Sequence, residues 1–372
     1  MNSLESIKAQ PNVLYVPSTP LNILVAVAHA VHFAPQQRAQ LVLIDQKNVQ
    51  DNAYYQVLKN WPNSPFEQVF ILPGKATGLG KVAERKANFE ILANVIKTFA
   101  VDVIATGSDR RIEFQYLMQL GKKQNLKLEG WYLDDGLYSY AGRAHHWFKD
   151  SISSLLKKAV YGHWWQEPKT VGASNWINQA WLFRPEQAVS ALQKKQMKTL
   201  DISWFTAPDV QIFSVQMCAL YGLQGDMLVR LQSVDCLILI PHPNNIQKMS
   251  GYVERIEVFL QTLYECGQKV AVKYHPRALE RDALKLEARF GVILVPERLA
   301  FEFVLPNLPA HAQIIGDVGT ALLTTKWLRP ELNGVAVLNE DSAFERAFKP
   351  ILHNLEVRIV QSYESAYEAV YD

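Results

Sequence analysis

The chain has 372 residues, of which 49% are hydrophobic, so it is long enough to form two globular domains with ordinary cores. Its 38 lysines and arginines nearly balance 36 aspartates and glutamates, which argues against a basic surface and a nucleic-acid partner. The 3 cysteines, Cys218, Cys236 and Cys266, form no Cys-x-x-Cys pair; they indicate neither a disulfide framework nor a zinc site, and they favour a reducing cytoplasm.

The start of the chain is not typical of an exported protein. Residues 1–16 have neither a basic start nor a following apolar core, so we expect no signal peptide. The apolar run over residues 21–33 is shorter than the about 20 residues of a membrane-spanning helix, and it contains Asn22 and His29. We therefore expect a cytoplasmic protein that is soluble or attached only to a membrane surface.

Strand-like and helical runs alternate over the first part of the chain. We expect strands over 12–16, 40–45, 67–72, 101–107 and 128–133, and helices over 19–33, 81–99 and 111–124. A less regular, tryptophan-rich segment follows from about residue 140 to residue 230. The alternation of strands and helices predicts a mostly parallel sheet that is covered by helices on both faces.

The same rhythm restarts in the second part of the chain. We expect strands over 234–241, 269–276, 291–296, 312–316 and 334–338, and helices over 250–267, 278–290 and 318–328. The sequence therefore predicts an α/β protein of two doubly wound domains that face each other across a ligand cleft, with a boundary between residues 210 and 211. In such folds ligands bind outside the carboxyl ends of the strands.

Two adjacent carboxylates, Asp134 and Asp135, follow the apolar strand over 128–133, and Gly136 comes next. Neighbouring carboxylates repel each other and burial disfavours their charge, so one of the pair is expected to take up protons readily. A carboxylate in this position can accept the proton of a hydroxyl. The alternative is a turn or a helix cap, because Asp-Gly is a common turn dipeptide.

Histidine precedes proline at His275-Pro276, where the predicted strand 269–276 ends. Proline in the first turn of the next predicted helix would place His275 at a helix N-terminus, where anions bind, and Lys273 and Arg277 add positive charge. This pattern predicts a phosphate site in which His275 donates a proton. The alternative is a capped strand–helix junction. A second His-Pro, at His242, lacks the flanking cations, so the dipeptide alone carries little information.

A third feature lies between the strand that ends at Gly316 and the next helix. Gly319 and Thr320 open that helix, where free backbone N–H groups and a hydroxyl can hold a phosphate. The alternative is an ordinary threonine cap. The sequence contains no Asp-x-Asp, the usual handle by which nucleotide-sugar enzymes hold a divalent metal.

This ordered set of motifs resembles the bacterial sialyltransferases, including the lipooligosaccharide sialyltransferase and bacterial polysialyltransferase families. Those enzymes share an acid-acid-glycine motif, a His-Pro motif and a late Ser-Ser/Thr motif, and they have two-domain GT-B folds. Residues 134–136 match the first motif and residues 275–276 match the second. In the third, Gly319-Thr320 stands where the families usually have two hydroxyl residues. The resemblance extends from about residue 13 to residue 328.

Two further segments support the resemblance. Residues 18–22, Ser-Thr-Pro-Leu-Asn, are similar to the Thr-Pro-Leu-Gln opening of the lipooligosaccharide enzymes, with Asn22 in place of glutamine. Residues 300–305 are similar to a Phe-Glu segment whose glutamate holds the donor ribose, which implies that role for Glu302. Residues assigned to the CMP donor are therefore Lys273, Pro276, Arg277, Glu302, Gly319, Thr320, Thr19 and Asn22.

The resemblance implies an inverting transferase that moves a nonulosonic acid from its CMP donor to a bacterial glycan. The sugar would be sialic acid or a pseudaminic or legionaminic relative, and the acceptor would be lipooligosaccharide or capsule. Asp134 would be the base, since the base of the family is usually the first acid, with Asp135 as the alternative. His275 would assist the departing phosphate. No metal is expected, because CMP carries one phosphate that cationic side chains can balance.

The resemblance also assigns the domains. Residues 1–210 would form the acceptor-side domain, and residues 211–372 the CMP-donor domain, whose last helix is a candidate for packing back on the first domain. Acceptor contacts are assigned to Asp109, Arg110 and Arg111, which follow another strand of the first domain; a solvated loop is the alternative. The oligomeric state cannot be predicted from the sequence.

The acceptor implied by the resemblance is lipid-linked, and one segment suits contact with a membrane surface. Ile152, Leu155, Leu156, Ala159 and Val160 share one face of a helical pattern, and the lysines at 157 and 158 lie away from it. The favoured alternative is that this face packs on the core of its own domain.

Two other functions remain open. One is a GT-B transferase that uses CMP-Kdo or a UDP-sugar, of which the UDP-sugar requires groups that balance a diphosphate. The other is a two-domain protein that binds a ligand in the cleft without chemistry.

Overall fold

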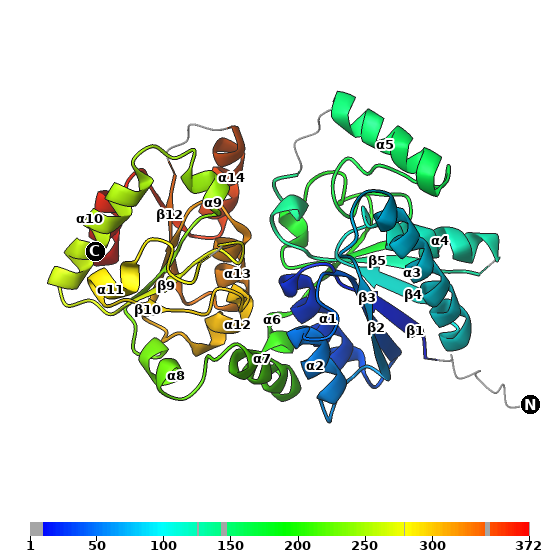
Figure 1. Ribbon diagram of the computed structural model, residues 1–372, viewed down its shortest axis with the longest axis horizontal. Helices are drawn as coiled ribbons and strands as arrows, with labels where there is room; N and C mark the ends of the chain where they lie inside the picture. Colours follow the sequence, from blue (N-terminus) through cyan, green and yellow to red (C-terminus); the bar gives the residue numbers. More distant parts are fainter. Residues whose placement is uncertain (1–9, 125, 143–146, 279, 339–342, 372) are drawn as a thin grey trace, which may run out of the picture. The chain divides into compact units, whose positions relative to one another are not determined.

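The computed structural model describes residues 10–124, 126–142, 147–278, 280–338 and 343–371 (Figure 1). The chain divides into two compact units, Met1–Phe213 and Ser214–Asp372. The division lies inside helix α7, Pro208–Leu220, beside the predicted boundary between residues 210 and 211. Among the described residues, none of the helices combines the length and the apolar character needed to cross a membrane.

The first unit is built on a parallel sheet of 7 strands in the order β3-β2-β1-β4-β5-β6-β7. The strands are β1 Asn12–Val16, β2 Arg38–Gln46, β3 Gln68–Pro73, β4 Val103–Thr106, β5 Glu129–Leu133, β6 Gln179–Leu182 and β7 Gln196–Thr199. The helices are α1 Pro20–Phe33, α2 Ala53–Asn60, α3 Gly78–Phe99, α4 Ile112–Lys123, η1 Leu137–Ser139, α5 Trp147–Tyr161, η2 Pro185–Gln187, α6 Ile202–Phe205 and α7. The chain reverses direction across the sheet between β1 and β4, so the unit is doubly wound.

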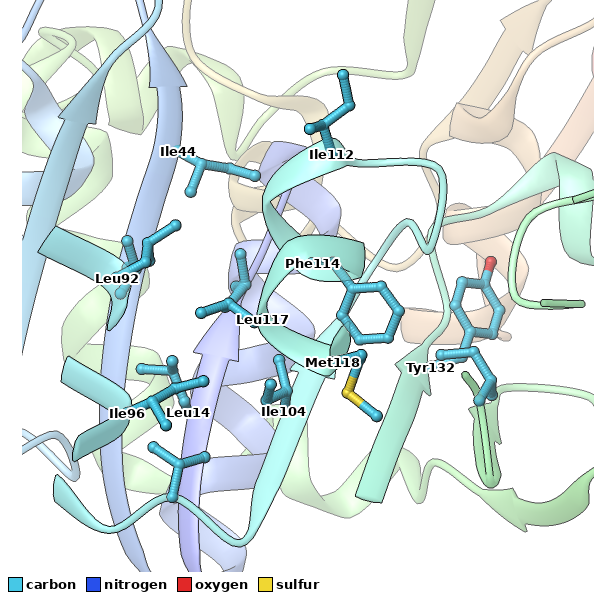
Figure 2. Close-up of a cluster of buried hydrophobic side chains, with 14 of the residues drawn as sticks. Leu14, Ile44, Leu92, Ile96, Ile104, Ile112, Phe114, Leu117, Met118 and Tyr132 are labelled. Carbon is cyan, nitrogen blue, oxygen red and sulfur yellow. The ribbon is translucent and has the colours of Figure 1, made fainter. Parts of the chain in front are cut away.

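Strand β1 shows why its sequence is a continuous apolar run. Leu14 points into a cluster with Leu92 of α3 and Leu117 of α4, as Figure 2 shows. Its neighbour Tyr15 points the other way, toward α1, where its hydroxyl bonds to Nδ1 of His29 at 2.7 Å. Successive side chains alternate between the two faces of a sheet, and helices cover both faces here. Both sets of side chains must therefore be buried.

The second unit has a parallel sheet of 6 strands in the order β10-β9-β8-β11-β12-β13. The strands are β8 Cys236–Leu239, β9 Val270–Lys273, β10 Ile293–Leu294, β11 Gln313–Gly316, β12 Asn333–Val337 and β13 Arg358–Val360. The helices are α8 Asp226–Leu231, α9 Pro243–Ile246, α10 Tyr252–Glu265, α11 Leu286–Phe290, α12 Phe301–Val304, η3 Leu305–Asn307, α13 Thr320–Leu328, α14 Ala343–Asn354 and α15 Tyr363–Tyr371. The chain order reverses between β8 and β11.

The prediction of two doubly wound α/β domains is confirmed, with local corrections. The segment that we expected to be irregular contains β6 and β7, which extend the first sheet beyond β5. The helix expected over 278–290 is shorter in the structure, where only α11 is present. The Asp282 carboxylate accepts the backbone N–H groups of Leu286 and Glu287, so the helix begins after this cap. The last helix, α15, packs on α10, β12 and β13 of its own unit.

Candidate functional site

The carboxyl ends of the strands next to each reversal are the expected ligand positions of the two units. In the first unit these ends lead into residues 17–19 after β1 and residues 107–109 after β4. In the second unit they lead into His242 after β8 and into Asp317 and Gly319 after β11. The three sequence motifs lie at or beside these positions.

Asp134 is completely buried, and four donors surround its carboxylate. Oδ1 accepts the Gly136 N–H at 3.0 Å and the Ser139 hydroxyl at 2.8 Å. Oδ2 accepts the Tyr140 hydroxyl and the Phe183 N–H, the latter at 3.2 Å. Burial raises the pKa of the Asp134 carboxyl, and these four hydrogen bonds act in the opposite direction. The side chain therefore organises the loop after β5 from inside the unit.

Asp135 is only half-buried and has a different partner. The Thr19 hydroxyl donates to its Oδ1. Thr19 is also the N-cap of α1, where its hydroxyl accepts the backbone N–H of Asn22 at 3.2 Å. The Asp135 carboxylate thus lies beside the N-terminus of α1, which favours a negative charge.

The two carboxylates differ in their access to solvent, because Asp134 is completely buried and Asp135 is half-buried. A base must reach the proton that it removes, and the Asp134 carboxylate is enclosed with both oxygens accepting hydrogen bonds. Gly136 completes the turn at φ 106°, in the region that favours glycine, and its N–H is one of the four donors. The glycine of the motif is thus needed for the Asp134 loop.

Asn22 was assigned to the donor by resemblance, but its side chain is fully buried. Its Nδ2 donates to the carbonyl oxygens of Leu133 at 3.1 Å and of Asp134 at 3.4 Å. A Cβ on Gly107 would lie within 2.2 Å of the Asn22 side chain, so these two residues are in close contact. Asn22 therefore holds the end of β5 in place, and through it the two carboxylates, and it does not face a ligand.

The three residues assigned to the acceptor also have internal partners. Asp109 is fully buried, and its carboxylate accepts the backbone N–H groups of Gly172 at 2.8 Å and Ser174 at 2.7 Å. Arg110 pairs with Glu167. Arg111 pairs with Asp45 at 2.8 Å across the ends of β4 and β2. Asp109 therefore anchors the loop around residue 172, which excludes direct acceptor contact by its carboxylate in this conformation.

His275 lies two residues after β9, which ends at Lys273, and a turn follows it instead of a helix. The Ala278 N–H donates to the His275 carbonyl oxygen at 2.8 Å. His275 therefore does not lie at a helix N-terminus, and the prediction that it does is wrong. The half-buried ring accepts the Arg277 N–H on Nδ1 at 3.1 Å. Burial, followed by electrostatic interaction with His242, Arg277 and Lys273, lowers the pKa of His275 to about 4. The ring is neutral at pH 7 and presents an Nε2–H donor.

Lys273 does not offer its charge to the surface. Its side chain is 4% exposed, and its Nζ donates to the carbonyl oxygen of Glu297 at 3.2 Å. Burial lowers the pKa of Lys273 to about 8, although partly buried Glu302 and Glu297 attract its charge. Lys273 therefore supports the segment that carries Glu302, while Arg277 is the exposed cation of the motif.

The helix predicted after Gly319 is confirmed as α13, which begins at Thr320. Both residues are half-exposed after β11, so their N–H groups lie at the second reversal. Asp317, which the sequence analysis did not single out, lies there too, and burial raises its pKa to about 7. His242 was also set aside, yet it lies at the same reversal, and its ring centroid is 4.7 Å from that of His275. Strand order would have been needed to identify either residue.

The apolar face of α5 does not pack on its own domain at the positions that the structure describes. Leu155 is 70% exposed, Leu156 is 61% exposed and Val160 is 42% exposed. Lys157, on another side of the helix, bonds to Glu167 at 3.2 Å and lies 4.2 Å from the Trp165 ring. The face of α5 that meets the unit is thus the one with Lys157. The side chain of Ile152 lies outside the described residues.

No protein-family model and no curated protein matches the chain. Among solved structures, the α/β-galactoside α-2,3-sialyltransferase of Photobacterium phosphoreum is similar with a TM-score of 0.61 and 12% identity, over 95% of this chain and 99% of that chain. A UDP-N-acetylglucosamine 2-epimerase of Rickettsia bellii has a TM-score of 0.53 and 14% identity, over 97% and 87%. Os79 of O. sativa, solved in complex with UDP, has a TM-score of 0.53 and 13% identity, over 96% and 89%.

At these identities the likeness concerns the fold. Sheets of 7 and 6 parallel strands, each covered by helices, match the GT-B fold of two Rossmann-like domains, so the predicted fold class is confirmed. The similar structures include a sialyltransferase, a UDP-N-acetylglucosamine 2-epimerase and a protein that was solved in complex with UDP.

Proposed function

We propose that this chain is an inverting glycosyltransferase that moves a nonulosonic acid from CMP to a hydroxyl of a bacterial surface glycan. The observation that carries the proposal is the ordered set of three motifs, each at the carboxyl end of a strand in one of two Rossmann-like units. The first unit would bind the acceptor and the second would bind the donor.

The proposed reaction is a single displacement. The Asp135 carboxylate takes the proton of the acceptor hydroxyl, whose oxygen forms a bond to the anomeric carbon of the donor. The bond from that carbon to the phosphate oxygen breaks, and its electron pair leaves with CMP. Neutral His275 donates a hydrogen bond from its Nε2–H to the departing phosphate, and this bond stabilises the negative charge that develops there. Arg277 and the N–H groups that open α13 are further donors for the phosphate.

A thermal-shift panel of CMP, UMP, UDP, GDP and ADP, with and without magnesium, tests the donor class. We expect CMP alone to shift the unfolding midpoint, with no effect of magnesium. At one hundred times its dissociation constant, CMP should raise the midpoint of the second unit by about 5–10 °C. A shift with UDP, or one that requires magnesium, would favour a UDP-sugar transferase. CMP binding without turnover of any CMP-sugar, CMP-Kdo included, would favour a non-catalytic binding protein.

The exposed face of α5 supports a lipid-linked acceptor and peripheral contact with the membrane. Replacing Leu155 and Leu156 together with glutamate should lower sedimentation with phosphatidylglycerol vesicles at least about 10-fold, because each buried leucine contributes about 1.5–3 kcal/mol. Val229→Glu is the matched control, since Val229 is 64% exposed on α8 of the second unit. If the wild type, the double variant and Val229→Glu sediment equally, the proposed contact with the membrane is wrong.

A further inference from the structure

The ends of β8 and β9 bring two histidines together. The strands are adjacent and parallel, with Leu239 paired to Lys273, so the His-Pro dipeptides that follow them emerge side by side. The ring centroids of His242 and His275 are 4.7 Å apart, and the ring planes meet at 61°. Both rings are half-buried. A dipeptide that carries little information alone thus occurs twice at one edge of the sheet.

Both rings are held in the same way. The Asn244 N–H donates to Nδ1 of His242 at 3.0 Å, and the Arg277 N–H donates to Nδ1 of His275 at 3.1 Å. A nitrogen that accepts a hydrogen bond carries no proton, so the proton of each neutral ring is assigned to Nε2. Within the described residues, neither Nε2 has a hydrogen-bond partner in the protein. The pair therefore presents two N–H donors.

Two such donors fit an anion better than a metal ion. A metal requires the lone pair of Nε2, which the assigned tautomer does not offer. Among the described residues, no group of three or more histidine, cysteine, aspartate or glutamate side chains could hold a metal. An oxyanion, in contrast, accepts both N–H groups. His242 also follows β8, the strand at the reversal, where the ligand of a doubly wound unit binds.

We propose that His242 and His275 form a two-imidazole site for a phosphate group, in which His242 is a second phosphate donor beside the His-Pro motif. The identity of the phosphate carrier as CMP rests on the proposed function. The phosphate contact itself does not, and inorganic phosphate tests it separately.

Two substitutions of His242 distinguish the roles of its two ring nitrogens. His242→Asn keeps an acceptor near the position of Nδ1, so the cap on Asn244 is preserved while the Nε2–H is lost. His242→Gln places an amide N–H near the position of Nε2 and loses the cap. His353→Asn is the matched control, because His353 is exposed on α14 of the same unit.

Calorimetric titration of the full chain with CMP, inorganic phosphate and cytidine tests the proposal. We expect His242→Asn to weaken the affinity for CMP and for phosphate about 10-fold, because a hydrogen bond to a charged group is lost. The affinity for cytidine should be unchanged. His242→Gln should recover part of the affinity, and His353→Asn should match the wild type. Nuclear magnetic resonance of ¹⁵N-labelled histidines should show the Nε2–H tautomer for both rings and a shift of both with phosphate.

The outcomes separate this inference from the proposed function. If CMP binds and His242→Asn binds it as tightly as the wild type, the two-imidazole site is wrong and the transferase proposal stands. If phosphate binding depends on His242 but CMP binds no better than UDP, the site stands and the donor class is wrong. If His242→Asn weakens cytidine binding as much as CMP binding, His242 contacts the nucleoside. If the wild type binds neither phosphate nor CMP, the two-imidazole site is wrong.

Discussion

Replacement of Asp135 by asparagine is expected to lower the rate of sugar transfer by about 10³-fold, because general bases contribute roughly 10²–10⁴-fold. CMP affinity should be unchanged, since the phosphate donors of the proposed reaction, His275, Arg277 and the N–H groups that open α13, lie in the second unit. The free energy of unfolding should also change little, because Asp135 is half-buried and asparagine can still accept the Thr19 hydrogen bond. Steady-state kinetics with a CMP-sugar and CMP titration of the same preparation provide the measurement.

Thr19 offers a matched test of how the Asp135 carboxylate is held. Thr19→Ser keeps the hydroxyl that donates to Asp135 and should retain most of the activity. Thr19→Val removes the hydroxyl; it should lower kcat more than it raises KM, and it should cost about 1 kcal/mol of stability through loss of the α1 cap. If Asp135→Asn is fully active, Asp135 is not the base, whatever the effect of the two Thr19 substitutions.

The sequence could predict the edge of the sheet at which the carboxylates lie, but not which of them faces the solvent. Neighbouring residues that continue a strand point to opposite faces. The Asp134 side is filled by Ser139, Tyr140 and Phe183, which the chain brings there from a short 3₁₀ turn and from the end of β6. That segment had been interpreted as irregular, so its donors could not be assigned to Asp134 before the structure was known.

The histidine pair shows the same limit for the second unit. The sequence predicted β8 and β9 correctly, and each ends near a His-Pro. Their adjacency depends on the strand order, in which β8 lies between β9 and β11. Local patterns do not determine that order, so His242 served as a negative comparison when it is in fact the neighbour of His275. Periodicity predicted the elements, whereas the partners of the polar residues required the tertiary fold.

Asp134 should behave as a structural residue, in contrast to Asp135. Asp134→Ala leaves four donors without their acceptor and is expected to lower the free energy of unfolding of the first unit by about 3 kcal/mol. Asp134→Asn should lower the free energy of unfolding by only about 1 kcal/mol. The amide oxygen can still accept at the position of Oδ1 and the Tyr140 hydroxyl can turn to accept from the NH₂ group, so only the Phe183 N–H loses its acceptor. Tryptophan fluorescence during urea unfolding follows this unit, because every tryptophan except Trp327 precedes residue 214.

The pH dependence gives a second signature of Asp134. Burial raises its pKa in the folded state, so the folded protein holds this proton more tightly than the unfolded chain does. The stability contributed by the group is fully present below about pH 4, the ordinary range of aspartate, and is lost as the pH rises through the folded-state pKa. The stability difference between wild type and Asp134→Ala should therefore be largest in acid and shrink toward neutral pH. If Asp134→Ala instead keeps its stability at every pH and loses transfer, Asp134 is the base, and its enclosure must open during the reaction.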